Sequence, residues 1–276
     1  MSELATIPAE PEADGYTPRI EVEVKDGIGW MTVSNPRRRN AVTYAMWRQI
    51  PAALADLAAD PSVRVVAVRG AGDSSFISGA DISEFATRRS TPEQVEEYER
   101  VADLATDALA GFEKPTVAVI RTWCVGGGIA TALGCDLRVA ASDTRFAIPA
   151  ARLGLGYRYS GLKRLTDVVG PAHAAEIFFT ARKYDATEAL NMGLINRTFE
   201  PEGFETAIAA YLADIAANAP LTMKAAKMAI RATTEDPGTR DLDAVAEAVQ
   251  ACFDSEDYAE GRAAFAEKRA PKFRGT

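Results

Sequence analysis

The chain has 276 residues, of which 47% are hydrophobic and 25% charged, the composition of a globular protein long enough to bury a large core. Acidic residues outnumber basic ones by 39 to 31, which argues against a nucleic-acid binder because such a protein needs a basic face. The chain has one histidine and three cysteines, and none of them shows metal-ligand spacing, which predicts that there is no metal site. The odd number of cysteines indicates reduced thiols and a cytoplasmic protein. No apolar run approaches the ~18 residues of a membrane span, so we expect no membrane partner.

The N-terminal part of the chain changes character near residue 19. Residues 1–18 are acidic and contain three prolines, which predicts a flexible tail. Hydrophobic and polar residues then alternate up to the turn signal Asp26-Gly27. This pattern predicts a β-hairpin whose second strand covers residues 28–33.

Strand and helix signals alternate through the middle of the chain and give way to helix signals alone. Strands are predicted at 63–69, 115–120 and 137–141, and helices at 43–59, 92–112 and 126–133. Beyond residue 160 helices are predicted at 171–180, 186–192, 204–218, 221–231, 242–253 and 257–268. This order predicts a mostly parallel α/β core over 19–200 and a helical region over 201–276.

Two glycine-containing loops stand at the ends of predicted strands. The first reads Gly-Ala-Asp-Ile at 79–82, and the second is the glycine triple at 126–128. A small residue lets a backbone N–H face a ligand without a side chain in the way, and two such groups can form an oxyanion hole. The alternative is that both loops are only tight turns. Neither loop matches a phosphate-binding signature.

Several longer motifs, in this order and spacing, are those of one family. They are Arg39-Asn40-Ala41, Phe76 through Ile82, Lys114 through Ala118, Val125 through Gly128, Cys135 through Arg138, Phe146 through Pro149, Ala186 through Ile195, and Glu260-Gly261. On these motifs the chain resembles the enoyl-CoA hydratase/isomerase, or crotonase, superfamily. The resemblance implies stacked ββα units, a C-terminal helical region that forms homotrimers or homohexamers, and an acyl-CoA substrate. No cofactor is implied beyond the coenzyme A of the substrate.

The resemblance also assigns roles to single positions. It implies that the backbone N–H groups of Ala80 and Gly127 hold the thioester carbonyl. Substrate contacts are implied at Arg39, Ala80, Asp81, Ile82, Ser83, Gly126, Gly127 and Lys268. Lys268 belongs to a segment that can approach coenzyme A from a neighbouring subunit. The alternative for Arg39 and Lys268 is that each is part of a solvated surface patch. Asp81 is expected to set the loop rather than to do chemistry.

The chain departs from the family at the two positions that carry glutamates in its hydratases. These positions are Ala130 and Ala150. Alanine can neither activate water nor protonate carbon, and each of those roles contributes on the order of 10²–10⁴-fold. Tyr157 and Arg158 are candidate replacements, with subunit contacts as the alternative role.

We therefore expect an acyl-CoA enzyme that stabilises a thioester enolate and is weak as a hydratase. One alternative is a hydrolase, decarboxylase or isomerase with relocated acid and base groups. Another is a protein that binds acyl-CoA without turning it over.

Overall fold

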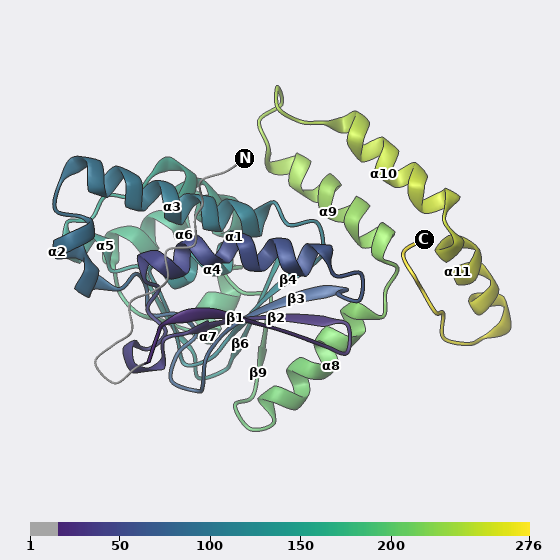
Figure 1. The fold of residues 1–276 in the computed structure, drawn as a ribbon, viewed down its shortest axis with the longest axis horizontal. Helices are drawn as coiled ribbons and strands as arrows, with labels where there is room; N and C mark the ends of the chain where they lie inside the picture. Colours follow the sequence, from purple (N-terminus) through teal and green to yellow (C-terminus); the bar gives the residue numbers. More distant parts are fainter. Residues whose placement is uncertain (1–15) are drawn as a thin grey trace.

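A computed structural model describes residues 16–276, so most of the predicted tail 1–18 lies outside the described residues. The predicted α/β class is confirmed by a six-stranded central sheet in the order β1-β2-β3-β4-β6-β9 (Figure 1). The hairpin strands β1 and β2 are antiparallel, and every other pair is parallel. The strands are β1 (Arg19–Lys25), β2 (Ile28–Ser34), β3 (Val65–Gly70), β4 (Thr116–Ile120), β6 (Leu137–Ala141) and β9 (Arg197–Phe199).

A second, three-stranded sheet was not predicted. It consists of β5 (Trp123–Val125), β7 (Arg145–Ala147) and β8 (Tyr184–Asp185). An isolated bridge pairs Ile77, just before the first glycine loop, with Cys124 of β5, and a second bridge pairs Ala80 of that loop with Val42. Strands of two or three residues are too short to show a period of two, and for the same reason the edge strand β9 was missed after residue 160.

The middle of the central sheet is covered on both faces, and β3 is apolar on both, whereas the edge strand β1 is mostly exposed. Val66 and Val68 pack into one core with α1 (Tyr44–Ala59), α3 (Pro92–Ala110) and α4 (Gly127–Gly134). Val65 and Ala67 pack against α8 (Phe204–Ala216) on the opposite face. Figure 1 shows α1 and α3 on one side of the sheet and α8 on the other. By its packing α8 belongs to the sheet, although it lies within the predicted region 201–276.

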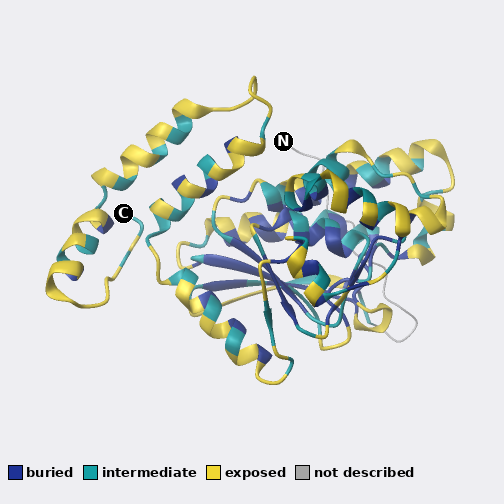
Figure 2. Ribbon diagram, turned by 180° about the vertical axis from the view of Figure 1, so that it is seen from behind, coloured by how far each residue is buried: buried dark blue, intermediate teal, exposed yellow. Residues whose placement is uncertain are grey.

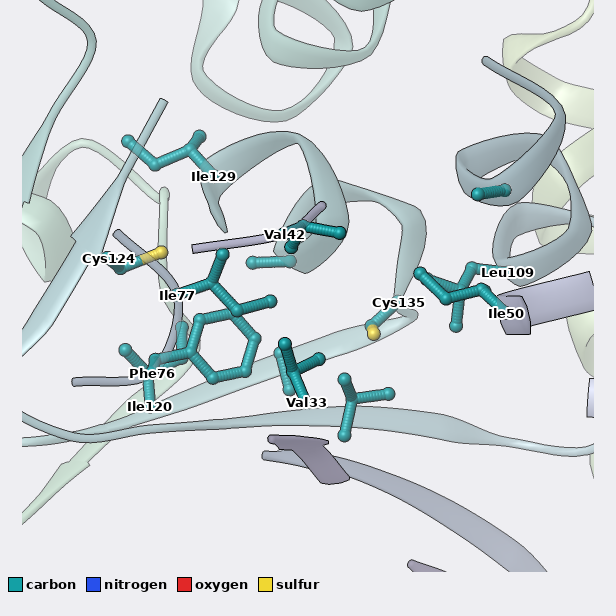
Figure 3. Packing of buried hydrophobic residues seen from close by; sticks show 14 of the residues in the cluster. Val33, Val42, Ile50, Phe76, Ile77, Leu109, Ile120, Cys124, Ile129 and Cys135 are labelled. Atoms are coloured by element: carbon teal, nitrogen blue, oxygen red, sulfur yellow. The ribbon is translucent and has the colours of Figure 1, made fainter. Parts of the chain in front are cut away.

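Buried side chains tie the glycine-loop region to the sheet. Phe76 and Ile77, which precede the first loop, pack with Cys124 and with Ile129 of α4 (Figure 3). Burial raises the pKa of the Cys124 thiol and raises that of Cys135 to about 12. Both thiols therefore stay protonated and serve as packing groups rather than nucleophiles.

The helices follow the predicted start signals at several points. Thr43 and Thr91 cap α1 and α3, since their hydroxyls accept hydrogen bonds from Met46 N and Gln94 N. The prediction at 171–180 covers only the second half of α6 (Tyr159–Thr180), a helix that is interrupted at Gly170, where φ and ψ are not helical. The remaining short helices are α2 (Phe85–Arg88), α5 (Ala150–Leu153), α7 (Ala186–Asn191) and the 3₁₀ turns Pro36–Arg38 and Ile82–Glu84.

The last three helices form an arm beside the sheet: α9 (Pro220–Thr234), α10 (Leu242–Asp254) and α11 (Glu256–Glu267) (Figure 1). Lys227 anchors α9, since its buried ammonium donates to Asp136 Oδ2 at 2.7 Å and to Lys114 O at 3.0 Å. Most of α10 and α11 is exposed (Figure 2), including Leu242 and Phe265. Within the described residues no helix is long and apolar enough to cross a membrane.

Candidate active site

One cavity of about 230 Å³ brings together most of the predicted site residues. It lies among α1, α3, α4, α5 and the start of α6, the end of the molecule opposite the arm (Figure 1). Its lining includes eight predicted residues: Ala80, Ile82, Gly126, Gly127, Ala130, Ala150, Tyr157 and Arg158.

The two glycine loops meet at this cavity. The first is held by Val42, whose N–H donates to Gly79 O at 2.8 Å and whose carbonyl accepts from Asp81 N at 2.9 Å. Ala80 lies between these bonds. A β-carbon built on Gly127 would lie 3.4 Å from Ala80 N, so the two backbone segments are direct neighbours.

The N–H groups of Ala80 and Gly127 are available at this meeting point. Neither donates a hydrogen bond to any residue between 16 and 276. Gly127 is the first residue of α4, where N–H groups have no partner within the helix and the helix dipole is positive. Two adjacent amides of this kind can hold a partly negative oxygen.

Glycine is required here for two separate reasons. Gly126 has φ 53° and ψ −111°, a conformation that side chains disfavour. Gly127 has an ordinary φ, but its β-carbon would press on Trp47 Cζ2 at 3.3 Å and would enter the space beside Ala80 N. The triple therefore keeps this part of the cavity open.

Ala130 and Ala150, the two positions at which the resemblance implies glutamates, line the same cavity. Ala130 lies in the first turn of α4, and Ala150 is the first residue of α5. Ala150 is 2% exposed. Neither position offers an ionisable group to a ligand in this cavity.

Tyr157, a predicted replacement, lies beside the second glycine loop. A β-carbon on Gly126 would lie 4.0 Å from the Tyr157 hydroxyl oxygen. Its ring packs edge-on against Phe178, with centroids 4.9 Å apart. Burial raises the pKa of Tyr157 to about 12, so the hydroxyl remains protonated and can donate a proton or a hydrogen bond.

Arg158, the other candidate replacement, lies at the rim. It is the N-cap residue of α6, and its guanidinium contacts Asp103 Oδ2 at 3.4 Å and Glu96 O at 3.3 Å. Its side chain is 42% exposed. It therefore connects α6 to α3 at the mouth of the cavity.

The other predicted substrate contacts lie in different surroundings. Asp81 is buried, and its Oδ1 accepts from Ser83 N at 3.0 Å, from Ser83 Oγ at 2.7 Å and from Arg38 at 3.1 Å. These bonds hold the conformation of the loop. Arg39 is exposed after the turn Pro36–Arg38. Lys268 caps α11 on the arm, remote from the cavity of its own chain (Figure 1).

Sequence reasoning missed three acidic residues of α3 that face arginines around the cavity. Glu99, Asp103 and Asp107 pair with Arg89, Arg158 and Arg164. The acidic residues are spaced four apart, which places them on one face of a helix. That spacing was visible in the sequence, but the arginines are brought to it only by the fold.

A metal is not favoured by the side chains of this site. No group of three histidine, cysteine, aspartate or glutamate side chains able to hold a metal ion occurs among residues 16–276.

Comparisons with known proteins agree with this fold. The family model described as enoyl-CoA hydratase/isomerase matches residues 23–276. A short-chain-enoyl-CoA hydratase of Clostridium acetobutylicum is 31% identical over 250 residues, which cover 91% of this chain and 95% of that protein. A crotonyl-CoA hydratase of Syntrophomonas wolfei is 30% identical over 254 residues, covering 92% and 97%.

Solved structures give the same result. A crystal structure described as an enoyl-CoA hydratase/carnithine racemase from Magnetospirillum magneticum superposes with a TM-score of 0.88 at 37% identity, covering 93% of this chain and 96% of that one. An enoyl-CoA hydratase/isomerase family protein from Hyphomonas neptunium gives a TM-score of 0.85 at 34% identity, covering 92% and 97%. The chain belongs to the enoyl-CoA hydratase/isomerase family, the crotonase superfamily of acyl-CoA enzymes.

Proposed function

We propose that this protein binds an acyl-CoA thioester with its carbonyl oxygen between the N–H groups of Ala80 and Gly127. The two unpartnered amides and the start of α4 support this placement. Negative charge develops on that oxygen when the thioester becomes an enolate, and donors fixed in advance stabilise it without reorganising. The reaction class is one that passes through a thioester enolate.

We further propose that hydration is slow in this member of the family. The observation that carries this proposal is alanine at both glutamate positions, 130 and 150, on the wall of the cavity. Hydration needs one group to activate water and another to protonate the α-carbon. Losing both roles removes contributions on the order of 10²–10⁴-fold each.

Crotonyl-CoA hydration by the purified protein tests this proposal. Under the same conditions, exchange of the α-protons of butyryl-CoA in D₂O reports whether the enolate forms. We expect exchange with little hydration. Hydration as fast as in a two-glutamate member would refute it, and binding of butyryl-CoA without exchange would instead indicate a protein that only binds acyl-CoA.

Tyr157 supports a second candidate, an isomerase or decarboxylase rather than a hydrolase. Its hydroxyl stays protonated beside Gly126, so it suits delivery of a proton to an enolate carbon. Hydrolysis would instead require activation of water, for which a protonated phenol is unsuited. A panel of 3-enoyl-CoA and malonyl-type thioesters distinguishes these reactions.

A homotrimer or a homohexamer is proposed as the working assembly. The exposed apolar residues of the arm support it, among them Leu242, Phe253 and Phe265. Burying such residues between subunits would be favourable. The same assembly would be needed for Lys268 to approach the coenzyme A of a neighbouring subunit, while Arg39 would approach it from the same chain. Light scattering coupled to gel filtration measures the assembly state, and a monomer would contradict it.

A further inference from the structure

The cavity contains a carboxylate that the family's motifs do not include. Glu99 of α3 pairs with Arg89, which follows α2, and both side chains line the same cavity as Ala80, Gly127 and Tyr157. The Arg89 side chain is 8% exposed and that of Glu99 is 25% exposed. An ion pair this withdrawn from water is costly unless its geometry is well fixed.

The surroundings of Arg89 fix one end of this pair. Its guanidinium lies over the rings of Phe85 and Tyr98, at 4.6 and 4.9 Å from their centroids. It donates through Nη2 to Glu99 Oε1. The second oxygen, Oε2, accepts no hydrogen bond from any residue that the structure describes. Glu99 is therefore oriented through one oxygen, and the other is available to a ligand.

Glu99 lines the same cavity as the amides of Ala80 and Gly127 and the side chain of Tyr157. Its negative charge contributes to the raised pKa of Tyr157, and the Tyr157 hydroxyl lies beside Gly126 of the oxyanion loop. Ala130 and Ala150, the positions at which the resemblance implies glutamates, also line this cavity and carry no ionisable group. Two α3 carboxylates line this cavity, Glu99 and Asp103, and Asp103 pairs with the half-exposed Arg158 at the rim.

We propose that Glu99 is the general base that takes the α-proton and that Arg89 is its positioning residue. The proposal rests on the proposed function, because it requires the thioester carbonyl to bind at Ala80 and Gly127. In the step, the α C–H bond breaks and its proton moves to Glu99 Oε2. The electron pair moves into the thioester, giving the enolate oxygen that the two N–H groups hold. Return of a proton to the α- or γ-carbon restores Glu99 as a carboxylate.

The electrostatics around Glu99 fit a group that exchanges protons. Burial raises its pKa, and nearby Asp103 raises it further, while Arg89 and Arg158 lower it. Together these effects raise the pKa of Glu99. A carboxylate with a raised pKa is a stronger base than an exposed glutamate. The activity should therefore fall as pH falls through a value above the ordinary one for glutamate.

The competing explanation is that the pair only holds α3 and the segment after α2 together. Two variants separate these roles. Glu99→Gln keeps the shape but leaves the Arg89 charge buried alone. The double variant Glu99→Gln with Arg89→Met removes both charges, and a buried pair that is only structural tolerates such replacement. Glu96→Gln, on an exposed part of the same helix, is the matched control.

The experiment measures α-proton exchange of butyryl-CoA in D₂O, butyryl-CoA affinity and thermal unfolding for all four proteins. We expect exchange to slow on the order of 10²–10⁴-fold in the single and double variants. Affinity should be retained, Glu96→Gln should match the wild type, and the acid limb of the rate against pH should disappear without Glu99. Wild-type exchange in the folded double variant, or an unchanged acid limb, would overturn this inference and leave the proposed function intact. A wild-type protein that exchanges no α-proton would refute both.

Discussion

Gly127 and Gly128 are adjacent in α4, yet substitution by alanine should lower activity at Gly127 and stability at Gly128. A β-carbon on Gly127 would meet Trp47 Cζ2 at 3.3 Å and Ala80 N at 3.4 Å. These contacts are tight but tolerable, and the new methyl group would occupy the space beside the two proposed oxyanion donors. A β-carbon on Gly128 would instead lie 2.3 Å from Ile77 O, which no small shift can relieve.

The magnitudes follow from these distances. Gly127→Ala should lower the rate of α-proton exchange on the order of 10²–10³-fold, or about 2.7–4 kcal/mol, as for loss of an oxyanion donor. Its stability should change by no more than ~1 kcal/mol, because alanine is the better helix former by about that amount. Gly128→Ala should cost about 1–3 kcal/mol of stability, as overpacking of a core does.

The assay is α-proton exchange of butyryl-CoA in D₂O, followed by NMR, beside urea unfolding of the same samples. We expect a stable Gly127→Ala protein with strongly reduced exchange activity and a destabilised Gly128→Ala protein. Full exchange activity in Gly127→Ala would refute the assignment of this amide to the thioester oxygen.

Three further predictions concern the missing acids, the phenol and the C-terminal segment. Ala130→Glu with Ala150→Glu should raise crotonyl-CoA hydration strongly, and an unchanged rate would count against the reason given for slow hydration. Tyr157→Phe should slow turnover of a 3-enoyl-CoA on the order of 10²–10⁴-fold at unchanged affinity; an unchanged rate would mean that the phenol only packs. Hydrogen bonds from Arg269 and from the Lys272 backbone lower the pKa of Glu260 from 4.5 to about 2. Because the pKa of Glu260 is lower in the folded than in the unfolded protein, its hydrogen bonds stabilise the folded C-terminal segment above pH 4.5. That stabilisation is lost as pH falls towards 2. Hydrogen-exchange protection of residues 268–276 should fall in that window, and Glu260→Gln should lose it at neutral pH.

Much of the fold could be predicted because its signals are local. The hairpin turn at Asp26-Gly27, the caps Thr43 and Thr91, and the apolar strand near β3 each depend on a few neighbouring residues. The positions of the two glycine loops could also be predicted, since glycine at a strand end indicates either a tight turn or a backbone N–H that faces a ligand. The structure adds that Ala80 and Gly127 are direct neighbours, which spacing alone could not show.

The remainder depends on contacts between distant segments. The strands β5, β7, β8 and β9 are too short to have a period, and they form only because the chain returns to pair with them. The pairing of Glu99 with Arg89 likewise needs α3 to lie beside the segment after α2. The motifs that carry the resemblance include the glycine loops but no residue of α3. They therefore gave no signal for Glu99.

A crystal structure with butyryl-CoA bound tests the central claim most directly. We expect the thioester oxygen to lie about 2.7–3.1 Å from both Ala80 N and Gly127 N, with the Glu99 carboxylate and the Tyr157 hydroxyl facing the acyl chain. A thioester oxygen bound elsewhere in the cavity, with these two amides still unpartnered, would contradict it.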